Sequence, residues 1–459
     1  MLLLPLILFL HLLLLANTRF TLWPEMVVYP YLLNNGFSLY RDIINPYMPS
    51  FIYFLVLLEK LFQSNPIYFQ AFTWAVILTV DILIFIIAKR LTAKTKDAIV
   101  AVSFFVIFSI PFAVNNLWFD LIQTPFVIMS CYFFYRFLKE PNERKSLFYS
   151  SIFLTIAFFI KQQAVWLVIY FVLVLIFRFG KKSAHIVLSQ PKIFAPSAIF
   201  FLMHLFFFAK VNLLSDFLFW AVYFPFIKAS SMPGYVLLPS AKQVLAIFVL
   251  FLIFIPLLFS KNTLKFFALG AFPLLMFAYP RFDYFHLIPA LSLLSLVAGA
   301  TLAQAFSHQK WWAPTIVTIA ILTLAIFSTR YFSRNWTREI RFFENEIYQT
   351  ANLVRRITEK SEPIYIQNGP DQILPLAHRL PTKPWAIQFP WYLEIDRTQL
   401  NVLEGIKQEK PRYVVARPYN SGPKYQIASY RPEKIAAYID ANYKNLIQIS
   451  DTLWLKVTK

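Results

Sequence analysis

Long apolar stretches alternate with short polar breaks along most of this chain. The stretches long enough to cross a bilayer, or nearly so, lie at 1–16, 66–88, 98–114, 121–138, 147–160, 164–177, 193–209, 243–260, 264–279, 286–305 and 312–329. Because a membrane helix needs about 20 apolar residues, this pattern predicts an α-helical polytopic membrane protein with about eleven transmembrane helices. The first stretch lacks the basic start and the small-residue cleavage site of a signal peptide, so we interpret it as a membrane helix.

The pattern changes at about residue 335 to that of a small extracytoplasmic α/β domain. Helical periodicity and strand-like alternation together predict helices at 337–359, 398–409 and 432–442 and strands at 363–367, 412–416 and 446–457. The expected domains are a transmembrane module at 1–330, with a long first outer loop at about 17–65, and a C-terminal domain at 335–459. The sequence contains no Gly-rich phosphate loop. Its Gly369-Pro370-Asp371 run is a turn signal and not a nucleotide-binding motif.

Composition supports the membrane interpretation. The chain has 459 residues, of which 58% are hydrophobic and 14% charged, whereas soluble domains carry about 25% charged residues. The formal charge of +20 does not indicate nucleic-acid binding, because the Lys and Arg residues lie in the breaks between apolar stretches. A single cysteine, Cys131, excludes an intramolecular disulfide.

The basic residues assign the two sides of the membrane. We interpret segment 48–63, which contains Pro49, Glu59 and Lys60, as a helix lying in the interface. Most basic residues then fall in one set of loops, at 89–96, 136–145, 178–192, 261–265 and Lys310, and fewer in the other, at Arg19, Arg41, Lys60, Lys161, Lys210, Lys228, Lys242 and Arg281. The positive-inside rule makes the first set cytoplasmic. This predicts a multi-pass plasma-membrane protein with a cytoplasmic N-terminus.

A reporter enzyme fused after Lys459 tests this orientation. We expect a reporter that works only outside the cytoplasm to be active, because the last apolar stretch should deliver residues after 330 to the outer side. Activity of a cytoplasm-dependent reporter at the same position would reverse the assignment of every loop.

Two carboxylates stand at the predicted outer boundary. Glu25 follows Pro24 in the first outer loop, and Asp120 precedes the stretch that begins near Leu121. An acidic residue at a membrane boundary is expensive to keep and suggests a functional site. Glu25 accepts a proton, holds a cation or is only a favourable charge at a helix start. Asp120 is a site residue, a helix cap or both.

Cations and further acids lie on the same predicted face. Arg281, Asp283 and His286 share one short outer loop, and Lys161 lies between two apolar stretches. Arg281 either binds a phosphate or pairs with Asp283, and Lys161 is a second candidate phosphate ligand. Asp42 beside Arg41 either forms a local ion pair, orders the loop or adds a third acid to the site. Asp81, inside an apolar stretch, has no functional interpretation and would hydrogen-bond a neighbouring helix or lie near the interface.

These segments resemble the GT-C fold of polyprenyl-phosphate-sugar-dependent glycosyltransferases, in the protein O-mannosyltransferase and aminoarabinose-transferase branch (family 39-like). The resemblance covers about residues 1–305 and is carried by Glu25 with Tyr29, Asn35-Gly36 with Leu39-Tyr40-Arg41-Asp42, Pro46 with Pro49, Ala88-Lys89-Arg90-Leu91, Asp120, and Arg281 with His286-Leu287-Ile288-Pro289. Family members have an Asp-Glu pair in the first outer loop, whereas this chain has Pro24-Glu25.

The resemblance implies an inverting transfer of a hexosyl or pentosyl group from a polyprenyl-phosphate donor. Glu25 would be the general base and Asp120 would orient a substrate or help to bind a divalent cation, so metal dependence stays open. Arg281, Lys161 and His286 would bind the donor phosphate, with Asp42, Arg41, Asp283 and Tyr29 in support. A glycan, a glycolipid or a protein would be the acceptor, and neither the sugar nor the oligomeric state follows from the sequence.

Other classes of protein fit less well. A membrane transporter or a lipid flippase of envelope glycan precursors would carry charges near the bilayer midplane and often internal repeats. In this sequence the candidate acids cluster at one predicted face, and no repeat between the two halves is visible. The Trp-Trp-Asp-Tyr-Gly signature of the oligosaccharyltransferase branch is absent. An oligosaccharide ligase or polymerase usually carries its large outer loop late in the chain, and a non-catalytic scaffold remains the simplest alternative.

Overall fold

The computed structural model describes residues 3–182, 191–232, 235–307, 312–385, 390–419 and 432–459. The chain forms two compact units. Unit 1 comprises Met1–Phe20, Gln70–Phe206 and Leu237–Arg338, and unit 2 comprises Thr21–Phe69, Phe207–Val236 and Glu339–Lys459. The last boundary lies close to the composition change at 335. Unit 2 also takes in most of the first outer loop and a segment from the middle of the chain.

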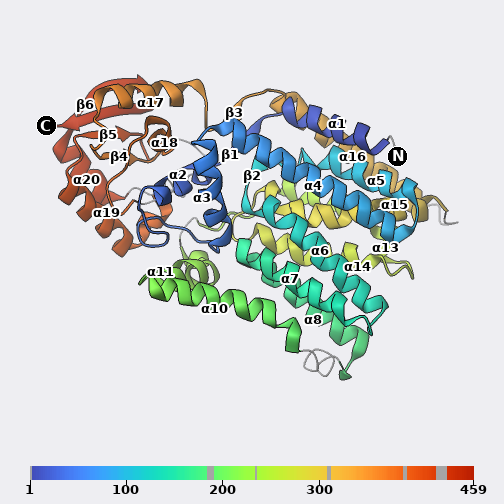
Figure 1. Ribbon diagram of the computed structural model, residues 1–459. Coiled ribbons are helices and arrows are strands. Elements are labelled where there is room, and N and C mark those ends of the chain that lie inside the picture. The colour runs from blue at the N-terminus through green and yellow to red at the C-terminus, as the bar shows by residue number, and fades with distance from the viewer. Residues whose placement is uncertain (1–2, 183–190, 233–234, 308–311, 386–389, 420–431) are drawn as a thin grey trace. The chain divides into compact units, whose positions relative to one another are not determined.

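Each predicted apolar stretch is mainly helical where it is described, although 98–114 leaves the helix after Ser109 (Figure 1). The α-helices are α1 (Leu3–Ala16), α4 (Pro66–Thr92), α5 (Thr95–Ser109), α6 (Phe119–Lys139), α7 (Arg144–Ile160), α8 (Val165–Phe179), α10 (Ala195–Lys210), α12 (Ala241–Leu252), α13 (Ile255–Leu258), α14 (Lys265–Leu274), α15 (Ile288–Ser307) and α16 (Trp312–Asn335). Short elements between them are β2 (Asn116–Leu117), η1 (Gln162–Ala164), η2 (Pro191–Ile193), η5 (Leu275–Ala278) and η6 (Tyr284–Leu287).

Five helical segments in the described part of the chain are long and apolar enough to cross a membrane, and four apolar helices are shorter. The stretch predicted at 243–260 is divided between α12 and α13. The number of eleven spans therefore stays a prediction. Lys310, which contributed to the predicted cytoplasmic side, lies outside the described residues.

Helix α15 forms the centre of unit 1. Almost all of its side chains are buried, and it packs against α5, α6 and α14. A Cβ atom at Gly299 would lie 2.4 Å from the backbone oxygen of Asp97 at the start of α5. Such a contact is shorter than atoms tolerate, so glycine permits the two helix backbones to approach each other closely.

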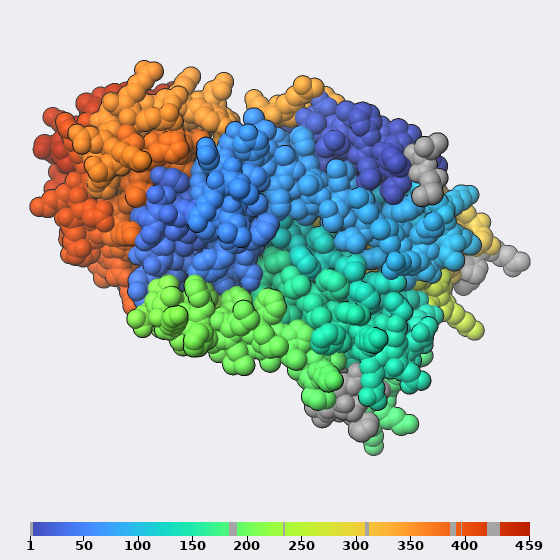
Figure 2. Space-filling model, viewed as in Figure 1, coloured from blue at the N-terminus to red at the C-terminus, as the bar shows by residue number. Residues whose placement is uncertain are grey.

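The outer surface of unit 1 is apolar, as a lipid-facing surface should be. Large exposed hydrophobic side chains lie on α4, α7, α8 and α10: Ile82, Ile86, Tyr149, Val168, Ile169, Val172, Leu173, Ile176, Ile199, Leu202 and Phe206. Figure 2 shows the light-blue and teal side chains of residues 70–179 forming a continuous surface on this face of unit 1. A contiguous apolar surface exposed to water would mark an interaction site, and here lipid is the natural partner.

Asp81 has a structural partner. Its Oδ2 atom lies 2.7 Å from Nδ1 of His11 on α1, and both side chains are fully buried. Of the two interpretations of Asp81, the hydrogen bond to a neighbouring helix is the one that the structure supports. A buried carboxylate needs such a partner, because an isolated one would be strongly destabilising.

Unit 2 combines short helices with one sheet. Its elements are β1 (Phe20–Leu22), α2 (Glu25–Asn34), α3 (Ser50–Phe62), α11 (Leu214–Phe217), the π-helix η3 (Leu218–Lys228), η4 (Ala229–Ser231), β3 (Ile340–Arg341), α17 (Asn345–Ile357), β4 (Ile364–Gln367), α18 (Ile373–Ala377), η7 (Pro390–Glu394), α19 (Asp396–Glu409), β5 (Tyr413–Ala416), α20 (Glu433–Asn442), β6 (Tyr443–Ser450) and β7 (Leu453–Thr458). At 13 residues, α3 is too short to span a bilayer alone.

The sheet has the order β4-β5-β7-β6. Strands β4 and β5 are parallel, with Ile364 opposite Tyr413, and the pairs β5–β7 and β7–β6 are antiparallel. Two predictions were wrong here. The closing strand at 446–457 is a hairpin that turns at Asp451-Thr452, and Asp is a common turn residue. The helix predicted from 337 begins at Asn345, because Phe342 has a positive φ that ends regular structure before it.

Candidate active site

Three of the predicted site residues meet inside unit 1. Oδ2 of Asp120 lies 2.7 Å from Nζ of Lys161 and 2.8 Å from Nδ1 of His286, and the two nitrogens are 3.1 Å apart. Asp120 and Lys161 are fully buried, and His286 is 8% exposed. We call Asp120, Lys161 and His286 the buried triad.

The helices bring the triad to one end of the helix bundle. Asp120 lies in the first turn of α6, Lys161 directly follows the end of α7, and His286 lies in η6 just before α15. Lys161 has an extended backbone that separates α7 from η1. Because α6 and α15 begin where α7 ends, the three side chains share one end, as the sequence predicted from their common membrane face.

The carboxylate of Asp120 is held by nitrogen donors rather than acting as a helix cap. Trp118 is the N-cap of α6, so the capping interpretation of Asp120 was wrong. Gln123, one turn later, offers its Nε2 to Oδ1 at 3.4 Å, and Thr124 donates to the Asp120 backbone oxygen. Sequence reasoning missed Gln123, although its position three residues after Asp120 on a helix indicated that the two side chains would be neighbours.

A divalent cation at Asp120 has little room. The ammonium of Lys161 already lies 2.7 Å from Oδ2, and a cation bound to this oxygen would meet that positive charge. Among the residues that the structure describes, no group of three or more His, Cys, Asp and Glu side chains could hold a metal ion.

Arg281 and Asp283 lie in the strand-like loop before η6. The loop is fixed to Leu237, which donates to the Pro280 oxygen at 2.9 Å and accepts from the Phe282 nitrogen at 2.7 Å. Oδ1 of Asp283 accepts from the Tyr284 nitrogen at 2.7 Å and so caps η6, the turn that carries His286. Arg281 is partly buried five residues before His286. Asp283 therefore orders the backbone at the triad.

Glu25 belongs to unit 2 and begins α2 after Pro24, as predicted. Its side chain is 4% exposed, and burial raises the pKa of its carboxyl group to about 8. Tyr29 lies one turn further along α2, and burial together with the nearby Glu25 charge raises its pKa well above the ordinary value. A carboxyl group with a pKa near neutrality is suited to accept a proton. Convergence of Glu25 with Asp120 and Arg281 stays a prediction.

Arg41 and Asp42 have separate partners, so their mutual ion pair was a wrong prediction. Arg41 pairs with Asp216 at 3.2 Å and donates to the Asn212 oxygen. Asp42 accepts from the Ser38 nitrogen at 2.7 Å, which confirms the alternative that it orders the loop.

Known proteins with a similar sequence or structure are glycosyltransferases. Residues 45–208 match the family model described as dolichyl-phosphate-mannose-protein mannosyltransferase. The chain is similar to the crystal structure of ArnT from Cupriavidus metallidurans bound to undecaprenyl phosphate, with a TM-score of 0.62 and 11% identity over 99% of this chain and 97% of that chain. The apo state of the same protein gives a TM-score of 0.63 at 11% identity over 98% and 97%.

A third similar structure is the oligosaccharyltransferase of Archaeoglobus fulgidus tethered with an acceptor peptide. It has a TM-score of 0.53 and 11% identity over 96% of this chain and 72% of that chain. No curated protein matches the sequence. The similarity to ArnT extends over nearly the whole of both chains, and so this chain has the GT-C fold that its sequence resembles.

Proposed function

We propose that this chain is an inverting glycosyltransferase that moves a sugar from a polyprenyl-phosphate donor to an acceptor at the extracytoplasmic face of the membrane. The observation that carries this proposal is the buried triad at one end of the membrane helices. Keeping a carboxylate, an ammonium and an imidazole in a buried position is costly, and positive charge held in place there is suited to a phosphate leaving group.

A lipid donor also needs an apolar place for its chain. Unit 1 contains a cavity of about 380 Å³ between α6, α7, α8 and α10. Its lining includes Phe134, Phe158, Phe159, Phe171, Phe194 and Phe201. Such a surface suits an isoprenoid chain, which offers only apolar contacts. It supports a lipid-linked donor over a nucleotide sugar, since the sequence lacks a Gly-rich phosphate loop.

In the proposed reaction an acceptor hydroxyl attacks the anomeric carbon of the donor sugar. Glu25 accepts the hydroxyl proton as the new glycosidic bond forms, and the bond between the anomeric carbon and the phosphate oxygen breaks on the opposite face. The electron pair of that bond leaves with the polyprenyl phosphate. The attack from the opposite face inverts the anomeric configuration.

Each triad residue has a separate part in this proposal. Lys161 and nearby Arg281 supply the positive charge that the departing phosphate requires, and His286 offers a hydrogen bond from its imidazole. Asp120 fixes the positions of Lys161 and His286, because both nitrogens contact the same carboxylate oxygen. Asp120 is then a positioning residue, and Tyr29 supports the surroundings of Glu25.

Arg281→Ala tests donor binding. We expect polyprenyl phosphate to bind roughly 10- to 100-fold more weakly, because a charge-assisted hydrogen bond contributes about 1.5–3 kcal/mol. Titration of the purified protein with polyprenyl phosphate, followed by native mass spectrometry, measures the change and identifies any lipid-linked sugar that co-purifies.

Lys192→Ala is the matched control, because Lys192 is an exposed cation of unit 1 on the predicted cytoplasmic side. It should bind the lipid as the wild type does. Equal weakening in both variants would indicate a general charge effect, and no weakening in Arg281→Ala would remove Arg281 from the proposed phosphate site.

A further inference from the structure

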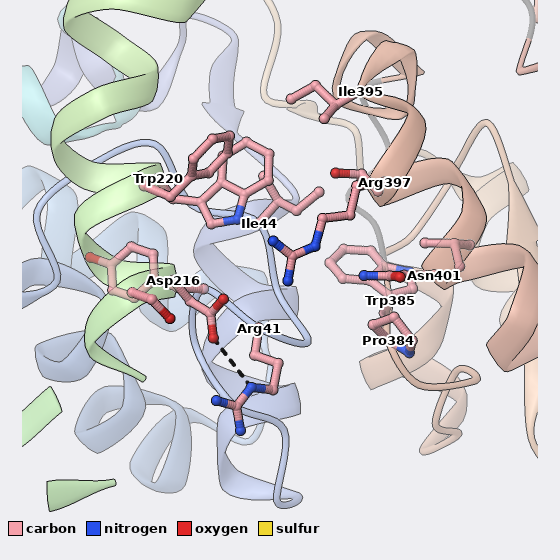
Figure 3. Close-up of a pocket in the computed structure, with 14 residues that line it drawn as sticks. Arg41, Ile44, Asp216, Trp220, Pro384, Trp385, Ile395, Arg397 and Asn401 are labelled. Carbon is pink, nitrogen blue, oxygen red and sulfur yellow. Dashed lines mark hydrogen bonds and ion pairs between the residues drawn. The ribbon is translucent and has the colours of Figure 1, made fainter. Parts of the chain in front are cut away.

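A second cavity lies entirely within unit 2, formed by residues far apart in the sequence. Its volume is about 720 Å³, which is within the range of roughly 300–1,000 Å³ typical of small-molecule sites. The first outer loop, the segment around η3 and the C-terminal region all contribute to it (Figure 3). We call it the unit 2 pocket.

Aromatic side chains form much of the pocket wall. Trp220 is 7% exposed and Trp385 is 2% exposed, so both rings are fixed by packing. Trp220 contacts Tyr392 edge to face, with ring centroids 5.8 Å apart, and Trp385 contacts Tyr29 in the same manner at 6.1 Å. Rigid indole rings offer apolar faces at little cost in conformational entropy. The indole nitrogen of Trp385 is itself shielded from solvent, so this residue meets the pocket with its ring and not with its N–H group.

Polar groups complete the pocket and leave it with positive charge. Arg41 is paired with Asp216, and Arg397 makes no hydrogen bond or ion pair with any described residue. Figure 3 shows the Arg397 guanidinium pointing into the space between Trp220 and Trp385. Asn401, on the same helix α19, adds an amide. An arginine in this position is suited to hold a carboxylate or another anion through two hydrogen bonds.

The pocket adjoins the helix that carries Glu25. The Tyr29 hydroxyl donates to the Ile44 oxygen at 2.8 Å, and Ile44 and Trp385 both line the pocket. Tyr29 thus contacts two wall residues and lies one helical turn from Glu25.

We propose that the unit 2 pocket binds an acidic saccharide, with the sugar ring against the indole faces and its anionic group on Arg397. Sugar hydroxyls exchange hydrogen bonds with the amide of Asn401. Its role as the acceptor of sugar transfer rests on the proposed function, whereas binding itself does not depend on turnover.

Calorimetric titration of the full-length protein in detergent, with no lipid donor, tests the proposal with three probes. These are glucuronate, glucose, which lacks the carboxylate, and acetate, which lacks the sugar. We expect glucuronate to bind at least tenfold more tightly than either of the others, because a charge-assisted hydrogen bond contributes about 1.5–3 kcal/mol. Equal binding of acetate would reveal a simple anion site, and equal binding of glucose would remove the role of Arg397.

Variants separate the contacts. Arg397→Gln should reduce glucuronate binding to the level of glucose, and Asn401→Ala, which removes the amide, should weaken both sugars by roughly two- to tenfold. Arg356→Gln, at an exposed position on α17, is the matched control and should bind as the wild type does. Undiminished glucuronate binding by Arg397→Gln would overturn the proposal, even if sugar transfer were confirmed.

Discussion

Asp120→Asn should unfold at a markedly lower temperature than the wild type and transfer no measurable sugar. Removing one partner of a buried ion pair costs about 3–5 kcal/mol, because the other charge stays buried without compensation. Here Lys161 would keep its ammonium in a fully buried position, 2.7 Å from an amide instead of a carboxylate. Thermal unfolding in detergent and a transfer assay with polyprenyl-phosphate sugar measure the two effects.

A double variant separates stability from chemistry. Asp120→Asn with Lys161→Met removes both charges and should recover most of the lost stability, since a neutral pair of similar volume is tolerated in a protein interior. Transfer should stay at least about 100-fold below the wild type, because a preorganised charge that stabilises the leaving phosphate is still missing. Recovery of transfer in the double variant would show that the triad is only structural.

Glu143→Gln is the control for this comparison. Glu143 pairs with Arg136 at 2.7 Å, and both side chains are about one third exposed or more. An exposed pair of this kind contributes about 0–1 kcal/mol. We therefore expect nearly unchanged unfolding temperature and transfer.

Glu25→Gln is expected to reduce transfer by roughly 10²- to 10⁴-fold, the usual contribution of a general base. In the wild type, kcat/KM should rise with pH and level off above about 8, the pKa of the buried Glu25 carboxyl group. The variant should lose this rise. A wild-type pH profile in the variant would show that another group takes the proton.

Whereas kcat/KM should rise with pH, the free energy of unfolding should fall. The pKa of Glu25 is raised from 4.5 to about 8 on folding, so the folded state takes up a proton between these values. Stability is then greatest below about pH 4.5 and declines as pH rises through 8. Since glutamine stays neutral, Glu25→Gln should unfold at a higher temperature than the wild type at pH 9 and at a similar one at pH 5.

Glu59→Gln is the matched control, because Glu59 is another buried glutamate of unit 2. Glu59 accepts hydrogen bonds from Asn34 at 2.5 Å and Ser64 at 3.1 Å. This variant should keep the pH profile of transfer. If both variants lost the pH profile of transfer, the cause would be a general disturbance of α2 and α3 and not the loss of the Glu25 carboxyl group.

The positions of the helices could be predicted from the sequence better than the contacts between them. Apolar runs located the helices of unit 1, because lipid-facing and core-facing positions both require apolar side chains. The topology placed Asp120, Lys161 and His286 on one face, but their contact joins residues 41 and 166 positions apart along the chain. Only packing of α6 against α7 and α15 fixes such distances, and periodicity contains no information about them.

Local sequence patterns also gave a wrong prediction where a short turn divides a strand. The hairpin of β6 and β7 reads as one alternating run, since a two-residue turn hardly interrupts the alternation. The unit 2 pocket had no local signal at all. Asp216, Trp385 and Arg397 are ordinary loop or helix residues in the sequence, and their grouping appears only when three distant segments are folded together.

The composite origin of that pocket limits how this protein can be re-engineered. A chimaera that receives the C-terminal region of a related enzyme would gain new counterparts of Trp385 and Arg397 but retain Arg41 and Asp216, which are joined by an ion pair. Such a hybrid would present two halves of different pockets. Grafting a new ligand preference therefore requires residues 21–69, 207–236 and 339–459 to be exchanged as one set.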